Sequence, residues 1–472
     1  MGRDRERKHS DDFLTRRELL RAGSLVAATG ALAACSRHVS ARSSPVEPLR
    51  RPGKVVVVGA GFAGIGAAER LLEAGCQVEV LEARDRIGGR VETVSLGGYP
   101  ADLGASWLRP YDNELYPFAE ARGLLSRRTA FDDVIAVSGG TAQRIDVAAA
   151  QGKLTQSIVL PYLGFQLRAA FGGNPASASI EELLGARLDE LGVEGCALRQ
   201  MVRNGSAAEL DSLSGNLLLA SSDVSDAELA SEPTIKGGMS ALLDALVERS
   251  RPVLGEVVEV ISREPGGVKV RTNKRIISAD AVIVTASIGV LKRGKIVFDP
   301  GLSPSQQSAL DHFDMGQFKK LWVRYPAGSW QPRANLMVDC DSSPIDCIFD
   351  FQASHGEPVL LGGAAGRNAV MFEKLPQAEA KQLLHEELQR ILATRLPSPT
   401  AFAMSEWGSD PWALGAYAYP NTGQRLRDAA ELRQPLGGRI LLAGEAIAEK
   451  NQGFVDGAWS DGRRAAGWLL AR

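Results

Sequence analysis

The segment from Val55 to Arg90 constrains the fold of this chain more than any other stretch. It begins with four consecutive valines, Val55–Val58, and such a β-branched run predicts a strand that a parallel sheet buries on both faces. A turn with the spacing G-x-G-x-x-G follows at Gly59–Gly64, and a helix-like pattern continues to Glu73. A strand, a glycine-rich turn and a helix in this order are typical of a unit that binds a dinucleotide.

Each glycine of the turn has its own physical role in this interpretation. Gly59 permits the tight turn, Gly61 lets the backbone approach a pyrophosphate, and Gly64 lets the helix pack closely on the strand. The helix that follows points its N-terminus at the phosphates, where free N–H groups and the helix dipole favour negative charge. The alternative is a glycine-rich turn that binds nothing, and the residues that follow argue against it.

An acidic residue, Glu82, ends a second strand-like run, Val78–Leu81, about 20 residues after the turn. A carboxylate at this position accepts hydrogen bonds from ribose hydroxyls and disfavours a 2′-phosphate, which disfavours NADP and leaves NAD and FAD. The run Arg86–Arg90 adds two arginines and two glycines, which suits a second close approach of the backbone to a pyrophosphate. From chemistry alone, a solvated turn also explains this run.

Six motifs together resemble the flavin amine oxidase family, which includes monoamine oxidases, polyamine oxidases and flavin-dependent histone demethylases. They are Gly59–Gly64, Glu82–Arg90, Asp102–Trp107, Lys236–Met239, Ala281–Lys292 and Ala443–Ala458. The likeness runs from about Lys54 to the C-terminus in the family's order. It implies an α/β fold, with a discontinuous Rossmann-like FAD-binding domain and an α+β substrate-binding domain that carries a helical insertion.

The resemblance also implies which residues hold FAD. In the family, the residue matching Glu445 lies near the ribityl–phosphate end of the flavin, the N–H matching Val455 lies near the flavin ring, and the strand valine matching Val258 contacts the adenine. Val258 is equally explained as a plain core valine. Ala416 stands where monoamine oxidases have a cysteine joined to the flavin, so non-covalent FAD is expected. The other expected cofactor-binding residues are Gly59, Gly61, Phe62, Ala63, Gly64, Glu82, Ala83, Arg84, Gly88, Gly89, Arg90, Gly104, Ala105, Ser106, Trp107, Trp412, Tyr417, Gly444, Gly453 and Phe454.

Lys320 is the first candidate for the chemical site. Alternation along its predicted strand puts Lys320 on one face with Trp322 and Arg324. In the family, a lysine a few residues after a glycine like Gly316 contacts flavin N5 through a water, and counting from Gly316 selects Lys320. A surface lysine on an edge strand is the alternative.

Tyr417 and Phe454 are the other two expected catalytic residues. In the family, rings at these positions face each other across the flavin and form a slot that orients the amine. Ordinary core packing is the alternative, because aromatic side chains are mostly buried. Phe454 replaces the tyrosine of many family members, which keeps an apolar wall and removes a hydroxyl.

Arg109 departs from the family pattern. Polyamine oxidases often have Trp-Ile-His-Gly where this chain has Trp107-Leu108-Arg109-Pro110. An arginine near the substrate entrance would disfavour a polycation and would pair with the carboxylate of an amino acid. A surface arginine fits the same sequence, so the substrate class stays open.

The motif order predicts a domain plan with three FAD-binding pieces. The expected segments are 53–108, 233–305 and 435–472 for FAD, 109–232 for the helical insertion and 306–434 for the substrate-binding domain. Apolar periodicity predicts insertion helices at Ile158–Ala170, Ile180–Leu191 and Cys196–Val202.

The N-terminal segment predicts export. Residues 1–35 combine Arg16-Arg17 with an apolar run, Leu25–Ala34, that is too short and too rich in alanine and glycine for a comfortable transmembrane helix. Together they resemble a twin-arginine (Tat) signal, so the Tat machinery is an expected partner and a periplasmic or other extracytoplasmic location is expected. Leu32–Cys35 resembles a lipoprotein processing box, which leaves a lipid anchor at Cys35 and a chance cysteine as equal alternatives. Residues 36–52 suit a flexible tether.

Composition and cysteine spacing exclude other classes. A formal net charge of −2 gives no electrostatic argument for nucleic acid. The five histidines do not have the spacing of metal ligands, so no metal is expected.

The cysteines give a separate set of expectations. Cys76 is expected to be a buried apolar residue. Cys340 and Cys347 flank a turn, where a disulfide is conceivable, and two free thiols are the expectation.

The sequence therefore predicts an FAD-dependent amine oxidase. It would oxidise a primary or secondary amine, or an amino acid, to an imine by hydride transfer to flavin N5. Water would hydrolyse the imine to a carbonyl, and oxygen or another acceptor would reoxidise the flavin, with hydrogen peroxide formed from oxygen. The alternatives are a flavin desaturase or dehydrogenase of the same fold and an exported FAD-binding protein without catalysis.

Overall fold

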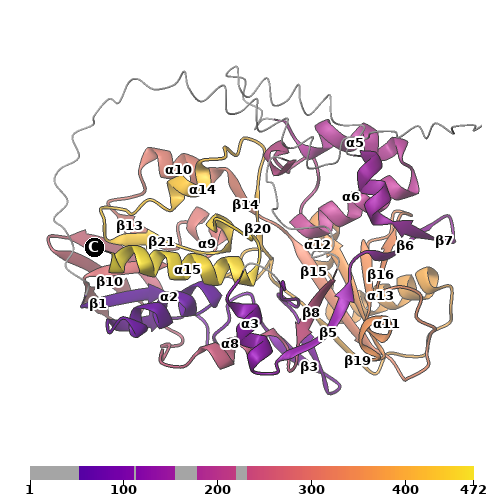
Figure 1. The fold of residues 1–472 in the computed structure, drawn as a ribbon, viewed down its shortest axis with the longest axis horizontal. Coiled ribbons are helices and arrows are strands. Elements are labelled where there is room, and N and C mark those ends of the chain that lie inside the picture. The colour runs from indigo at the N-terminus through magenta and orange to yellow at the C-terminus, as the bar shows by residue number, and fades with distance from the viewer. Residues whose placement is uncertain (1–52, 111–112, 155–177, 219–230, 472) are drawn as a thin grey trace, which may run out of the picture.

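The computed structural model describes residues 53–110, 113–154, 178–218 and 231–471 (Figure 1). The expected signal segment, the lipidation expected at Cys35, the expected tether and the helix expected at Ile158–Ala170 fall outside the described residues.

A four-stranded parallel sheet forms the Rossmann-like core, in the order β2-β1-β12-β21. Its strands are β1 (Lys54–Val58), β2 (Gln77–Leu81), β12 (Ala281–Val284) and β21 (Ile440–Leu442). Val55, Val56 and Val57 are fully buried, as the valine run predicts. The three pieces of chain that supply these strands are far apart in sequence, which confirms a discontinuous Rossmann-like fold.

Two helices pack against each other on this sheet. They are α2 (Phe62–Glu73) and α15 (Val455–Leu470), which lie side by side in Figure 1. A Cβ atom on Gly462 of α15 would lie 1.9 Å from the carbonyl oxygen of Ala63 in α2. The first and last helices of the unit therefore approach so closely that glycine is required at the crossing.

A second sheet and several short helices complete this half of the molecule. The sheet has the order β11-β10-β9-β13 and contains β9 (Val258–Glu264), β10 (Gly267–Thr272), β11 (Ile276–Ala279) and β13 (Val297–Asp299). The helices are α3 (Leu115–Ala121), α8 (Met239–Leu246), α9 (Ile288–Lys292), α10 (Pro304–Asp311), α14 (Asp428–Leu432) and the 3-10 helix η3 (Glu445–Ile447). Apolar side chains of β9, β10 and β12 share one core.

A seven-stranded mixed sheet forms the other half, in the order β19-β15-β18-β17-β16-β6-β7. Its strands are β6 (Asp133–Ser138), β7 (Thr141–Asp146), β15 (Phe318–Arg324), β16 (Leu336–Asp339), β17 (Cys347–Asp350), β18 (Val359–Ala365) and β19 (Ala401–Met404). Helices α11 (Phe351–His355), α12 (Gly366–Glu373) and α13 (Gln377–Leu392) accompany it. Leu384 and Leu388 of α13 pack in a core with Leu321 and Val323 of β15, so this face of the sheet is covered.

Three two-stranded sheets connect the halves. The pairs are β3 (Thr93–Leu96) with β4 (Tyr99–Asp102), β5 (Leu125–Ala130) with β8 (Ser231–Ile235), and β14 (Phe313–Met315) with β20 (Ala418–Pro420).

The segment 109–232 differs from the expected helical insertion. It contains α5 (Ile180–Glu190), α6 (Val193–Ser206) and the 3-10 helix η2 (Gly215–Leu218), yet it also contributes β5, β6 and β7. Strand β6 pairs in parallel with β16 and so extends the seven-stranded sheet. The run Val134–Val137 followed by Gly139-Gly140 is a hairpin signal, and helix periodicity elsewhere in the segment does not reveal it.

The expectation for the cysteines is wrong at Cys340. This residue forms a disulfide with Cys196 of α6, with a Cα–Cα distance of 6.1 Å, whereas Cys347 is a buried free thiol. In the β16–β17 pair, Cys347 lies opposite Val338, so Cys340 lies past the end of β16 and cannot face it. Cys76 is buried and free, as expected.

Neither a membrane span nor a metal cluster is found within the described ranges. No helix there is long and apolar enough to cross a membrane. No group of three or more histidine, cysteine, aspartate or glutamate side chains gathers there in a way that could hold a metal ion.

Candidate active site

A cavity of about 720 Å³ extends from the Rossmann-like sheet to the seven-stranded sheet. It is lined by every residue expected to bind the cofactor or act in catalysis except Gly64. A Cβ atom on Gly64 would lie 1.9 Å from the carbonyl oxygen of Gly59, so this glycine serves the close packing of α2 on the turn. The structure therefore brings the sequence-predicted residues together in one place.

Two stretches of backbone flank the cavity where a pyrophosphate is expected. Helix α2 begins after Gly61, and no side chain caps its N-terminal N–H groups. A Cβ atom on Gly89 would lie 3.8 Å from the Cα of Gly61, so the two stretches face each other. Free N–H groups without intervening side chains are suited to phosphate oxygens.

Glu82 lies at the carboxyl end of β2 and holds the glycine-rich turn. Its carboxylate accepts hydrogen bonds from the backbone N–H of Ala60 at 2.8 Å and of Arg84 at 2.9 Å. The side chain is buried and borders the cavity. This is the position at which an acid meets a ribose in Rossmann-like units.

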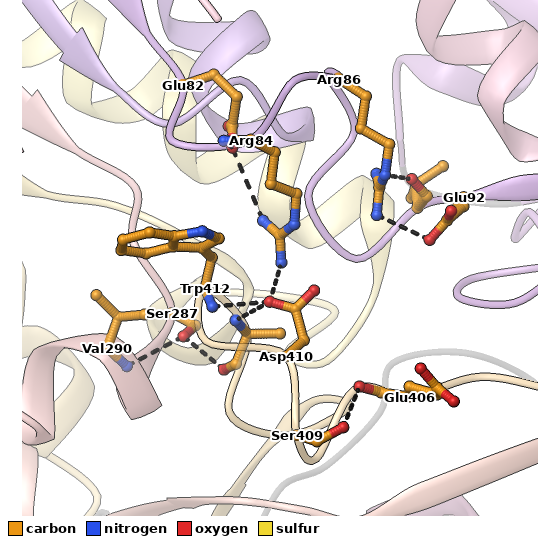
Figure 2. Close-up of polar contacts among 12 residues, drawn as sticks. Glu82, Arg84, Arg86, Glu92, Ser287, Val290, Glu406, Ser409, Asp410 and Trp412 are labelled. Atoms are coloured by element: carbon orange, nitrogen blue, oxygen red, sulfur yellow. Dashed lines mark hydrogen bonds and ion pairs between the residues drawn. The ribbon is translucent and has the colours of Figure 1, made fainter. Parts of the chain in front are cut away.

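Arg84 connects the end of β2 to the loop that carries Trp412 (Figure 2). It donates a hydrogen bond to Asp410 at 2.8 Å and lies 3.8 Å from Glu82. Asp410 also accepts hydrogen bonds from the N–H groups of Trp412 and Ala413. The Trp412 side of the cavity is thereby fixed to the Rossmann-like core, through a partner that the sequence did not reveal.

Glu445 provides a hydrogen-bond acceptor for a ligand. Arg90 donates to its Oε1 at 2.7 Å and to the carbonyl oxygen of Ala416 at 3.2 Å. Its Oε2 atom is buried without a hydrogen-bond partner among the described residues. Buried polar atoms are almost always paired, so this oxygen fits a ligand that donates, such as the ribityl hydroxyl chain of FAD.

Helix α15 directs its N-terminus at the cavity. The residue before it, Phe454, makes no side-chain cap, and both Phe454 and Val455 line the cavity. The positive end of a helix dipole stabilises negative charge, which fits the ring of a reduced flavin. With the glycine backbone, Glu82 and Glu445, the residues present fit FAD.

Lys320 lies buried on β15 against the same cavity. Its Nζ donates to the carbonyl oxygen of Gly104 at 2.5 Å and to the hydroxyl of Ser106, and it lies 5.0 Å from the Trp107 ring centroid. Burial lowers the pKa of Lys320 to about 8, although the nearby Asp102 opposes the shift. A lysine with this pKa can hold or release a proton near neutral pH, which a surface lysine cannot do.

The two expected aromatic residues line the cavity from different elements. Tyr417 precedes β20, and its hydroxyl donates to the carbonyl oxygen of Asn204 in α6. Its ring centroid lies 6.2 Å from that of Phe318. Phe454 lies at the start of α15 and is 40% exposed.

Glu232 is a cavity residue that the sequence motifs did not reveal. It lies on β8, is buried, and lines the cavity. Burial raises the pKa of its carboxyl to about 7, Arg109 opposes the shift and Asp456 adds to it. An acid directly before the strand sequence Pro233-Thr234-Ile235 is the one signal that could have identified it.

Arg109 pairs with the protein's own carboxylate. Its Nε lies 4.0 Å from Glu232, its Nη1 donates to Asn451 at 2.7 Å, and its guanidinium carbon lies 3.1 Å from the Phe454 ring centroid. Arg109 is not among the residues that line the cavity. The structure therefore gives no support to the expectation that it repels a polycation or receives a substrate carboxylate.

Comparison with known proteins identifies the family. The family model described as flavin containing amine oxidoreductase matches residues 62–470. Polyamine oxidase 2 of Arabidopsis thaliana is 30% identical over 437 residues, which cover 88% of each chain. Lysine-specific histone demethylase 1 homolog 2 of the same plant is 28% identical, with 89% of this chain and 58% of the relative covered. The chain belongs to the flavin-containing amine oxidoreductase family.

The fold has a solved counterpart in putrescine oxidase. The wild-type enzyme bound to putrescine aligns with a TM-score of 0.74 and 23% identity, over 89% of this chain and 99% of that one. The chain is thus an FAD-dependent amine oxidoreductase with the α/β fold of these enzymes.

Substitution of Gly61 tests the cofactor cradle. A Cβ atom at Gly61 would meet only the carbonyl oxygen of Gly88, at an ordinary 3.6 Å, so Gly61→Val is compatible with the fold and projects into the phosphate region. We expect FAD affinity to fall about tenfold or more, which is about 1.4 kcal/mol. Flavin absorbance per protein measures this, and circular dichroism checks the fold. Full flavin occupancy in a folded variant would refute the location of the pyrophosphate.

Proposed function

We propose that the chain oxidises a small diamine or polyamine. The amine carbon gives a hydride to flavin N5, water hydrolyses the resulting imine to a carbonyl, and oxygen receives the electrons to give hydrogen peroxide. The observation that carries the proposal is that a buried carboxyl, Glu232, lines the same cavity as Lys320, Tyr417 and Phe454. The names of the relatives, polyamine oxidase and putrescine oxidase, support this substrate class.

The side chains divide the work in this proposal. Bound FAD supplies the acceptor for the hydride. Tyr417 and Phe454 orient the reacting amine by contact with their rings. The apolar lining from Phe131, Leu336 and Phe349 favours the neutral amine over the ammonium, and only the neutral form can give up a hydride. Glu232 receives a second, distal ammonium, and Lys320 holds a proton close to the reacting atoms.

The absorption spectrum of the anaerobic flavoprotein tests this function. The protein is mixed in turn with monoamines, diamines, polyamines and amino acids. We expect the flavin absorbance to bleach with diamines or polyamines at lower concentrations than with monoamines of similar length. Bleaching by amino acids alone would refute the substrate class. No bleaching by any amine would refute amine oxidation and favour a desaturase or a protein that only binds FAD.

Substitution of Glu232 tests the role of the carboxyl. Glu232→Gln keeps the shape and removes the charge, so KM for a diamine should rise about 10- to 100-fold, the equivalent of one charge-assisted hydrogen bond of about 1.5–3 kcal/mol. Because the pKa is about 7, the carboxylate is lost below that pH, and the wild-type preference for a diamine over a monoamine should shrink as pH falls through 7.

The controls separate charge from structure. KM for a monoamine should stay unchanged in Glu232→Gln, and Glu264→Gln, on β9 and outside the cavity lining, should leave KM for both substrates unchanged. An equal loss for monoamine and diamine would contradict recognition of the second amino group.

We also propose that the chain is exported through the Tat machinery and is anchored by a lipid at Cys35. The Arg16-Arg17 pair and the apolar run before Cys35 support this. The Cys196–Cys340 disulfide adds support, because such bonds persist mainly in oxidising compartments. Lysine at both positions 16 and 17 should retain the folded flavoprotein in the cytoplasm, and Cys35→Ala should release it from the membrane fraction. Unchanged fractionation of either variant would contradict the corresponding step.

A further inference from the structure

A second cavity, of about 250 Å³, is lined in part by Ser106, the hydrogen-bond partner of Lys320. Exposed Arg127 and Lys236 border it on the outside, and buried Asp102 and Ser106 border it on the inside. The other lining residues are Tyr99, Pro100, Ser126, Thr234, Ile235, Trp322, Phe351, His355 and Glu357. Ser106 is the one residue common to both cavities among those that the structure describes.

The side chain of Ser106 therefore lies between Lys320 and the second cavity. It is 3% exposed, and its hydroxyl is hydrogen-bonded to Lys320 Nζ. The same hydroxyl lies 3.4 Å from the carbonyl oxygen of Gly104 and 3.5 Å from that of Asp102. A hydroxyl can accept one hydrogen bond while it donates another, so this position can pass a proton between its two neighbours.

The proposed reaction requires such a proton. Reduction of oxygen to hydrogen peroxide consumes two electrons and two protons. A hydride from the amine carbon supplies both electrons and one proton, so the other proton comes from the protein or the solvent. Bound FAD and substrate fill the first cavity, which has a largely apolar lining, and this restricts the access of water from that side.

We propose that the second cavity is a water-filled port that supplies protons to Lys320 through the Ser106 hydroxyl. Lys320 releases a proton from Nζ into the first cavity and becomes a neutral amine. Ser106 then gives its hydroxyl proton to Nζ and takes one from a hydronium ion in the second cavity, which becomes water. The N–H bond of Lys320 and the O–H bond of Ser106 break and re-form, one O–H bond of the hydronium ion breaks, and one proton moves inward from solvent. The proposal rests on the proposed function, because the proton is needed only if oxygen accepts the electrons.

Burial and nearby carboxylates keep the other titratable groups of the port neutral. Burial, and after it the charges of Asp102 and Glu357, raises the pKa of the Tyr99 hydroxyl, whereas Arg324 lowers it. Burial lowers the pKa of His355 to about 4, so its ring stays neutral while Nε2 pairs with Thr234.

Positive charge lies mainly at the outer side of the port. Arg127 and Lys236 are exposed there, and Arg324 is 3.4 Å from Glu357. At the inner side, Asp102 and Cys347 are the titratable groups that act on Lys320. The interior therefore holds carboxylates and neutral groups, which suits water that carries a proton.

Four variants of the holoenzyme test the port. Ser106→Ala removes the hydroxyl and Ser106→Thr keeps it. Ser126→Trp fills the second cavity from β5, and Ser126→Ala is its matched control. The enzyme is reduced with an amine or with dithionite and then mixed with oxygen in H₂O and in D₂O, while flavin absorbance is followed. Crystal structures of the wild type and Ser126→Trp provide a readout that is independent of turnover.

We expect Ser106→Ala and Ser126→Trp to slow reoxidation about tenfold and to raise its solvent isotope effect, and anaerobic reduction by the amine should be unchanged in Ser126→Trp. Ser106→Thr should recover most of the reoxidation rate that Ser106→Ala loses, and Ser126→Ala should reoxidise like the wild type. Lys320→Met should be as slow as Ser126→Trp, and the double variant should be no slower than either, because both act on one path. Ordered waters should connect Arg127 to Ser106 in the wild type and be absent from Ser126→Trp.

Three results would refute the proposal that the second cavity supplies protons. The first is unchanged reoxidation in a folded Ser126→Trp variant. The second is slower reoxidation of Ser126→Trp without a solvent isotope effect, which would indicate that the second cavity conducts oxygen and not protons. The third is a dry second cavity in the wild-type crystal. Failure of every amine to reduce the wild-type flavin would refute the proposed function instead, and reduction with dithionite would still test the port.

Discussion

Asp102 joins the two halves of this enzyme, and the geometry of the site depends on it. Its carboxylate accepts hydrogen bonds from Thr93 of β3 and from the N–H of Met239 at the start of α8. Its carbonyl oxygen accepts from Trp322 and, at 3.5 Å, from Lys320, both on β15. One buried residue thus fixes strand β15 of the substrate side against the Rossmann-like side. Because unsatisfied buried donors are costly, a shift of either half would be opposed by several lost bonds at once.

Burial in this region shifts the pKa values of its ionisable groups toward the uncharged forms. The pKa of Asp102 rises to about 6 and that of Lys320 falls to about 8, and desolvation is the largest cause in both cases. Each group limits the shift of the other by its charge. The attraction between the two opposite charges therefore offsets part of the cost of their burial.

The parts of the fold that the sequence could predict are those set by neighbouring residues. Val55–Val58, the glycine turn and Glu82 act within one short stretch, and their strand, helix and acid appear where expected. The Cys196–Cys340 disulfide joins residues 144 positions apart, and no local pattern could identify it.

The pairing of β6 with β16 could not be predicted either, because these two strands are also far apart in the sequence. Glu232 was missed and the role of Arg109 stayed open because both depend on tertiary contacts: burial raises the pKa of Glu232, and the guanidinium of Arg109 lies over the ring of Phe454. Sequence patterns report local geometry, whereas the chemistry of this cavity arises from what the fold places around each charge.

The order of the strands has a consequence for biosynthesis. Strand β21 and helix α15 are the last elements of the chain, yet β21 completes the parallel sheet beside β12 and α15 packs on α2. A nascent chain that has released β1 and α2 from the ribosome still lacks the final wall of the cofactor cavity. The glycine turn is therefore synthesised early but gains this wall of the cavity only after β21 and α15 have been made.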